Sequence, residues 1–259
     1  MRRLIFFSLI FFCGCSSLEL FTSLPENAVT KNDYRFYDAN SKIRYQITNE
    51  EKNLIIRLNT VEIPTIMKIL RSGLTFYFDV NGKKQTKVYF QYPIAHNGQM
   101  SVAPERPEFL KGQRPEMDIK GMLVKASKIG VFVSNDKTEE ISVLSPNSEI
   151  RVNVEALNNS EITYELSIPF TKISANGTPA LSNLSIGIVS EKLEMHTKTG
   201  SKHEGMQEGG SPGGMQGGTP PNGRGRQGGM QDSDRPDDEP NMASMSTSVE
   251  FWFKVDLAK

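Results

Sequence analysis

The stretch Gly73–Pro93, GLTFYFDVNGKKQTKVYFQYP, contains the pattern that decides the fold. Apolar and aromatic residues alternate with other residues on both sides of an Asn-Gly turn signal, at Leu74, Phe76 and Phe78 and again at Val88, Phe90 and Tyr92. A period of two is typical of half-buried strands. The stretch therefore predicts a β-hairpin at the centre of an antiparallel sheet.

The loop of this hairpin determines its register. A two-residue turn at Asn81-Gly82 would place Phe76 opposite Lys87, and a register slip of one residue moves a whole apolar set to the other face of a sheet. A loop with an odd number of residues instead places Phe76 opposite Val88. We therefore expect a loop of about three or five residues in place of the two-residue turn.

Further short strands are expected on both sides of the hairpin. Strand-like patterns occupy residues 34–37, 43–47, 54–58, 122–125, 130–133, 141–144, 150–156, 162–168, 184–189 and 249–257. Residues 62–71 have apolar side chains at helical spacing, and Gly73 stands at the position of a helix C-cap. Many short strands with one short helix predict an all-β fold, an antiparallel two-sheet β-sandwich of jelly-roll-like type.

The N-terminus has the pattern of a bacterial lipoprotein signal. Two arginines precede an apolar run too short to span a bilayer, and a small residue stands directly before Cys15. On this interpretation residues 1–14 are the signal peptide, Cys15 is the lipidated N-terminus and residues 15–32 are a tether. An ordinary signal peptide with a coincidental cysteine is the alternative. Because Cys13 leaves with the signal, the mature chain has no free thiol for a disulfide, a metal or catalysis.

The net charge of the chain and the residues after Cys15 indicate which partners and which cellular location to expect. The formal net charge is +0, which gives no reason to expect a nucleic-acid partner. No acidic run of the kind that resembles a surface-export signal follows Cys15. The expected location is the cell envelope, as an outer-membrane lipoprotein that faces the periplasm.

A long polar insertion interrupts the chain before its last strand. Residues 197–246 contain no aromatic residue, leucine, isoleucine or valine, and 12 of the 21 glycines lie between Gly200 and Gly229. Such a segment cannot bury enough apolar surface to offset the entropy lost on ordering. We expect residues 196–246 to be a disordered insertion in a sandwich domain that spans 33–195 and 247–259.

Several segments together resemble the carbohydrate-binding-module family 9-like (DOMON-like) β-sandwiches of Bacteroidota proteins. These segments are 45–49 (YQITN), Asn53-Leu54, 69–74 (ILRSGL), 79–84 (DVNGKK), 164–169 (YELSIP) and 250–253 (EFWF). The resemblance covers most of the chain between residues 33 and 190 and the last strand, and it implies the sandwich fold. Sugar-binding members resemble one another in a pair of tryptophans that clamp the ring, whereas this chain has one tryptophan.

The sequence offers little for catalysis. The three histidines are His96, His196 and His203, and no nucleophile-elbow, zinc-protease or phosphate-loop motif is present. We therefore expect no enzyme activity, no cofactor and no metal site. One alternative is copper binding by the soft thioethers of the insertion, which together with the flanking Met195 are Met206, Met215, Met230, Met242 and Met245. The other is that the insertion is a flexible polar loop.

Trp252 is the candidate ligand-binding residue. The alternation of the last strand places it on the face opposite Phe251 and Phe253, where an aromatic ring can stack on a sugar or a partner protein. The alternative is that Trp252 packs under a loop or into the second layer and binds nothing. The same two interpretations apply to Tyr77 and Tyr89. The expected function is that of a non-catalytic accessory module binding a glycan. The alternative is an assembly lipoprotein that docks a protein through the sandwich or the insertion.

Overall fold

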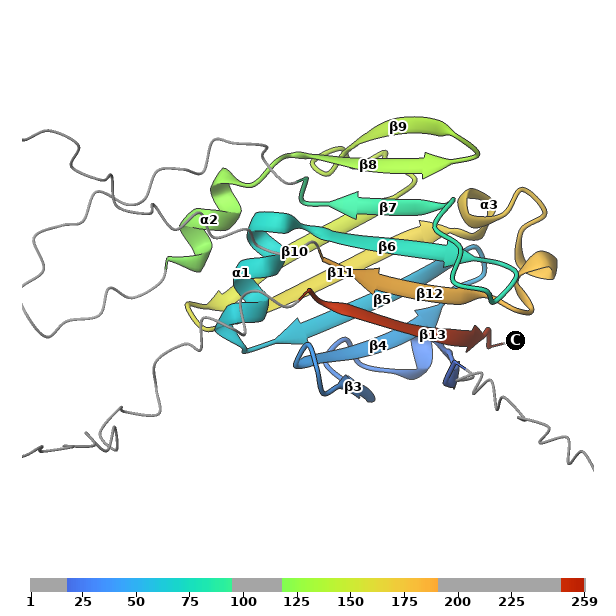
Figure 1. The fold of residues 1–259 in the computed structure, drawn as a ribbon, viewed down its shortest axis with the longest axis horizontal. Coiled ribbons are helices and arrows are strands. Elements are labelled where there is room, and N and C mark those ends of the chain that lie inside the picture. The colour runs from blue at the N-terminus through green and yellow to red at the C-terminus, as the bar shows by residue number, and fades with distance from the viewer. Residues whose placement is uncertain (1–17, 95–117, 191–247, 259) are drawn as a thin grey trace, which may run out of the picture.

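The computed structural model describes residues 18–94, 118–190 and 248–258. Within these ranges the chain forms two β-sheets packed face to face with three short α-helices (Figure 1), which confirms the expected β-sandwich. The predicted signal peptide, Cys15 and the insertion 196–246 lie outside the described residues.

The first sheet, sheet A, has seven strands in the order β1-β13-β12-β6-β7-β8-β9. Their bounds are β1 Leu20–Thr22, β13 Glu250–Asp256, β12 Ser185–Val189, β6 Leu74–Asp79, β7 Tyr89–Tyr92, β8 Ile129–Ser134 and β9 Lys137–Ser142. Neighbouring strands are antiparallel except β1 and β13, which run parallel. The last strand of the chain therefore lies inside the sheet, between β1 and β12.

The second sheet, sheet B, has six strands, with the order β10-β11-β5-β4-β2 and with β3 also paired to β4. Their bounds are β10 Arg151–Asn158, β11 Glu161–Pro169, β5 Asn53–Thr60, β4 Ile43–Asn49, β2 Leu24–Pro25 and β3 Phe36–Asp38. Among the described strands of this sheet, β2 and β4 form the one parallel pair.

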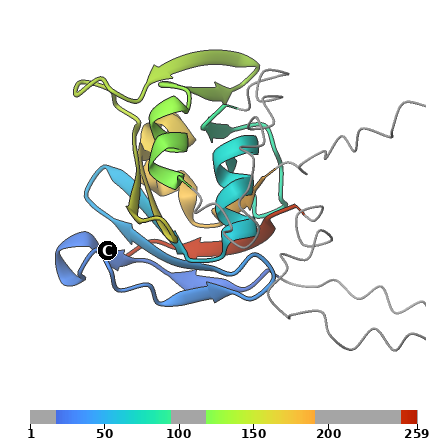
Figure 2. The ribbon, with the colours of Figure 1, turned by 90° about the vertical axis from the view of Figure 1, so that its left-hand side faces the viewer.

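The helices lie at the ends of the sandwich (Figures 1 and 2). They are α1 Ile63–Ser72, α2 Ile119–Lys125 and α3 Phe170–Ile173, and there are also two 3-10 turns, η1 Glu26–Ala28 and η2 Thr178–Leu181. Helix α1 is the helix predicted from the sequence. Gly73 is its C-cap, as predicted; it has φ of 74° and donates its backbone N–H to the carbonyl of Ile69 at 3.0 Å.

The hairpin has the expected faces but not the expected register. Phe76 lies opposite Phe90 and not Val88, so the pairing is shifted by two residues, and the loop covers residues 80–88 and is longer than predicted. The physical reason is Asp79, whose buried carboxylate accepts backbone N–H groups of Asn81, Lys83 and Gln85 at 3.0, 2.5 and 3.2 Å. The loop folds around this carboxylate.

Two further expectations are corrected by the structure. Residues 20–25, assigned above to a tether, form β1 and β2 and pair with β13 and β4. Residues 122–125 belong to a helix and not a strand, since the Asp118 side chain caps α2 by accepting the N–H of Gly121 at 2.8 Å. A short apolar run does not by itself distinguish a strand from a helix. Strand β9 also begins before residue 141, at Lys137.

The core lies between the sheets and is rich in aromatic rings. Tyr164 of β11 is 1% exposed, and its ring centroid lies 5.2 Å from that of Phe76 in sheet A. Its hydroxyl donates to the carbonyl of Tyr92, also in sheet A, at 3.1 Å. Tyr45 of sheet B stacks on Phe253 of sheet A, with centroids 5.3 Å apart. Tyrosines of sheet B thus link the two sheets at two places.

We expect Tyr164→Phe to lower the free energy of unfolding by about 1 kcal/mol, because it removes a buried hydrogen bond between the sheets. The measurement is urea unfolding followed by circular dichroism. Tyr37→Phe is the matched control, since this residue is 56% exposed. Equal effects of the two substitutions would contradict the linking role of Tyr164.

Candidate functional site

The outer face of sheet A has a row of aromatic side chains, which we call the aromatic row: Trp252, Tyr77 and Tyr89. In the sheet, Trp252 is opposite Gly187, Gly187 is opposite Tyr77, and Tyr77 is opposite Tyr89. The Trp252 and Tyr77 rings are nearly parallel, at 11°, with centroids 5.8 Å apart, and the Tyr77 and Tyr89 centroids are 5.6 Å apart. All three residues are partly exposed.

Gly187 creates the space for the Trp252 indole. A Cβ atom on Gly187 would lie 2.5 Å from the indole Cε2 and Cζ2 atoms. The indole therefore lies across the glycine backbone, close to the surface of the sheet. A glycine inside a strand is often a site of close approach, so the isolated glycine in SIGIV is the signal in the sequence that could have indicated this contact.

The structure places Trp252 on the face predicted for it. Its neighbours Phe251 and Phe253 point the other way, where both contact Tyr45 of sheet B. The indole packs on the sheet itself and stacks on Tyr77, so it is neither isolated nor simply covered by a loop. Tyr77 and Tyr89 belong to the outer face, although the hairpin's other aromatic residues, Phe76, Phe78, Phe90 and Tyr92, are core residues.

Charged and polar residues lie on either side of the aromatic row. Glu250 and Lys254 lie two positions either way from Trp252 on the same face of β13. The β6–β7 loop reaches Lys254, since a Cβ on Gly82 would lie 3.0 Å from the Lys254 Cε atom. The row is therefore an apolar strip with an exposed carboxylate on one side and an amine on the other.

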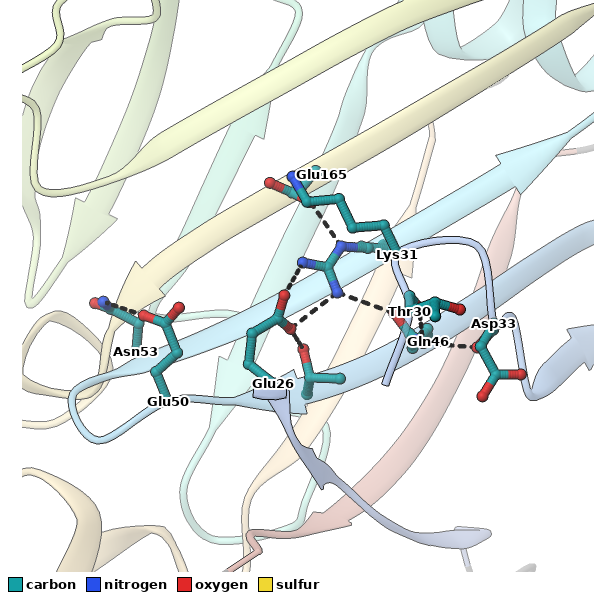
Figure 3. Close-up of polar contacts among 10 residues, drawn as sticks. Glu26, Thr30, Lys31, Asp33, Gln46, Glu50, Asn53 and Glu165 are labelled. Atoms are coloured by element: carbon teal, nitrogen blue, oxygen red, sulfur yellow. Dashed lines mark hydrogen bonds and ion pairs between the residues drawn. The ribbon is translucent and has the colours of Figure 1, made fainter. Parts of the chain in front are cut away.

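The outer face of sheet B has a different character, because it carries a buried guanidinium, and Figure 3 labels its partners Glu26, Gln46 and Glu165. Arg57 of β5 is 4% exposed. Its Nη2 and Nη1 atoms donate to the two carboxylate oxygens of Glu26 at 2.5 and 2.9 Å, and its Nε donates to Glu165 at 2.6 Å. Nη1 also donates to the Gln46 side chain at 2.9 Å. We call these four residues the Arg57 network.

The segment 26–33 covers part of this face. Glu26 lies in η1, and the Gln46 amide donates to the backbone carbonyls of Thr30 and Asp33 at 3.0 and 2.7 Å. Sequence reasoning missed the network, since Arg57 and Glu26 are 31 positions apart and Glu26 was assigned to a tether.

The Arg57 network shifts the protonation equilibria of its members. Burial is the largest single influence on Glu26 and would raise its pKa, but hydrogen bonds from Arg57 and Thr48, together with the charge of Arg57, bring the pKa below its ordinary value of 4.5. For Arg57, burial opposes the charged form, and the two glutamates outweigh it and raise the pKa.

The described residues hold no group of three or more His, Cys, Asp or Glu side chains that could bind a metal ion. His96, His196 and His203, and the six methionines considered for copper, lie outside the described residues. None of the helices in the described ranges is long and apolar enough to cross a membrane.

No protein-family model, curated protein or solved structure matches this chain.

We expect Gly187→Ala to displace the indole of Trp252, since the new methyl group would overlap it. Trp252 is the single tryptophan of the chain, so its fluorescence reports this contact alone. The emission should shift to longer wavelength as the ring becomes more exposed to water. Val131→Ala, on the same face of β8, is the control and should leave the emission unchanged. An unchanged spectrum in Gly187→Ala would contradict the packing described.

We expect Glu26→Gln to lower the free energy of unfolding at neutral pH by about 2 kcal/mol, because it weakens charge-assisted hydrogen bonds to Arg57. The pKa of Glu26 is lower in the folded than in the unfolded state, so its carboxylate stabilises the fold above the unfolded value of about 4.5. This contribution is lost as pH falls through the folded pKa.

Urea unfolding measured across acidic pH tests this expectation. The wild type should lose stability with acidification more steeply than Glu26→Gln. Glu155→Gln, an exposed carboxylate on the same sheet, is the control and should follow the wild type. Parallel pH profiles for the wild type and Glu26→Gln would show that Glu26 does not stabilise the fold through its charge.

Proposed function

We propose that this protein is a non-catalytic binding module of the bacterial cell envelope that binds a glycan on its aromatic row. The observation that carries the proposal is the row itself, in which the Tyr77 ring contacts those of both Trp252 and Tyr89, and all three residues are partly exposed on one sheet face. Aromatic rings combine a large apolar surface with low conformational freedom, which suits them to stack on the apolar face of a sugar ring.

The polar neighbours of the row fit the same ligand. Sugar hydroxyl groups both donate and accept hydrogen bonds. Glu250 accepts and Lys254 donates, and they lie on opposite sides of Trp252 on the face that carries the row. The resemblance to family 9-like carbohydrate-binding modules adds to this proposal. With a single tryptophan in the chain, a glycan that packs on the row from one side is favoured over a sugar ring clamped between two indoles.

We also propose that Cys15 carries the lipid anchor, and the fold gives this proposal a geometric consequence. Strand β1 begins at Leu20, so four residues separate it from Cys15. An extended chain spans about 3.5 Å per residue, so the start of β1 would stay within roughly 20 Å of the membrane surface. The tether is then much shorter than the 15–32 segment expected from the sequence, and the β1 edge of sheet A would face the lipid.

We expect Trp252→Ala to weaken polysaccharide binding about tenfold, because it removes the largest ring of the row. Affinity electrophoresis in gels containing neutral bacterial or plant polysaccharides measures the retardation. Tyr37→Ala removes an exposed aromatic residue of sheet B and is the control. Equal retardation of Trp252→Ala and the wild type, or no retardation of the wild type in any gel, would contradict the proposal.

The same experiment separates glycan binding from the alternative function. The alternative predicts that the wild type binds no polysaccharide but can be crosslinked to an envelope protein. If deletion of residues 196–246 abolishes this crosslink, the protein is better described as an assembly lipoprotein.

A further inference from the structure

A polar cleft lies beside the Arg57 network on the outer face of sheet B, on the opposite side of the sandwich from the aromatic row. Its volume is about 410 Å³, within the range of small-molecule sites. Glu26, Lys31 and Glu50 line one side, Arg151, Asn153 and Ser167 line the other, and Ile55 lies between them. Figure 3 labels the three residues of the first side, Glu26, Lys31 and Glu50.

Ser167 is the residue that points to a ligand. It is 6% exposed, and its hydroxyl is the one buried side-chain polar atom of the described residues without a hydrogen-bond partner. In the sheet it lies between Ile55 of β5 and Arg151 of β10. An apolar side chain and a guanidinium on either side offer it no acceptor. A buried hydroxyl without a partner is unfavourable, so a hydrogen-bonding group that enters the cleft would stabilise it.

Arg151 is the second group without an internal partner. Its exposed side chain makes no ion pair or hydrogen bond with any described residue, whereas Arg57, on the same face, is held by Glu26 and Glu165. Arg151 and Ser167 are directly paired in the sheet. Two hydrogen-bonding groups without partners therefore lie side by side on one wall of the cleft.

The charges of the cleft select the kind of ligand. Three cationic residues and three carboxylates line it, so its formal charge is zero: Lys31, Arg57 and Arg151 against Glu26, Glu50 and Glu165. An anion would meet the carboxylates, and a cation would meet the guanidinium groups. A neutral polyhydroxylated molecule can donate to the carboxylates and accept from Arg151, and its hydroxyls can do both with Ser167.

We propose that this cleft is a second binding site, which takes one ring of a neutral sugar. Ser167 and Arg151 hydrogen-bond its hydroxyl groups from one wall, Glu50 accepts from the other, and the apolar Ile55 side chain lies against the ring. The site goes beyond the function proposed for the aromatic row and does not depend on it, because the two surfaces lie on different sheets and share no residue.

The test is nuclear magnetic resonance of the full ¹⁵N-labelled chain with defined probes. These are D-glucose, D-galactose, D-mannose and N-acetyl-D-glucosamine at millimolar concentration, with D-galacturonate and D-glucosamine as charged probes. We expect saturable shifts of the Ser167 and Arg151 amides with at least one neutral sugar, and none with the charged pair. Trp252→Ala should show the same shifts, so failure of the aromatic row as a site leaves this test intact.

Ser167→Ala distinguishes a binding role from a structural one. It should weaken sugar binding about tenfold or more. Without sugar its thermal midpoint should be equal to or above that of the wild type, because an unsatisfied buried hydroxyl is removed. Thr163→Ala, on the same strand and face but outside the cleft, is the matched control and should bind like the wild type.

Three results would overturn the proposal. The first is the absence of saturable shifts with all four neutral sugars. The second is equal or stronger binding of galacturonate or glucosamine, which would assign the cleft to a charged ligand. The third is a lower thermal midpoint of Ser167→Ala with unchanged sugar binding, which would show that the hydroxyl serves the fold.

Discussion

The position of one sheet on the other depends on the contact that Tyr164 makes across the core. Its ring packs on Phe76, and its hydroxyl donates to the carbonyl of Tyr92, so one side chain of sheet B makes both an apolar and a polar contact with sheet A. Apolar packing alone tolerates small shifts between sheets, whereas a buried hydroxyl must find its acceptor. Burial also raises the pKa of Tyr164 well above 10.0, so the hydroxyl keeps its proton. This bond therefore restricts the relative position of the sheets.

Once the inward residues are fixed, the alternation of each strand determines what the outer faces carry. Phe76 and Phe253 point inward, so Tyr77 and Trp252 lie outward and come together across Gly187. On β5 the same rule places Arg57 outward, between two buried neighbours of the core. A register slip of one residue in either sheet would bury a charged side chain or expose aromatic residues of the core. The aromatic row and the Arg57 network are consequences of the register that builds the core.

The sequence predicts those features that depend on neighbouring residues. Helix α1 with its cap at Gly73, most of the strands and the outward face of Trp252 follow from local periodicity. The hairpin register does not, because three backbone N–H groups fold around the Asp79 carboxylate and lengthen the loop. The stacking of Trp252 on Tyr77 requires the strand order β13-β12-β6, which alternation cannot give. The pairing of Arg57 with Glu26 joins residues 31 positions apart, and the segment around Glu26 has no periodic pattern from which its position could be predicted.

The groups that the fold already uses also indicate which groups remain for binding. Arg57 is the most buried cation of its face, yet it directs its donors to Glu26, Glu165 and Gln46, so it supports the surface and is poorly placed to hold a ligand. Its charge is compensated, and moving it would leave two carboxylates without their partner. Ser167, one row further along the same face, is as well buried but has no partner among the described residues. The fold provides hydrogen-bond partners for the Arg57 guanidinium but none for the Ser167 hydroxyl. If the cleft binds a ligand as proposed, the Ser167 hydroxyl and its neighbour Arg151 are the groups left to bind it, and a ligand that makes hydrogen bonds suits them better than one that brings a charge.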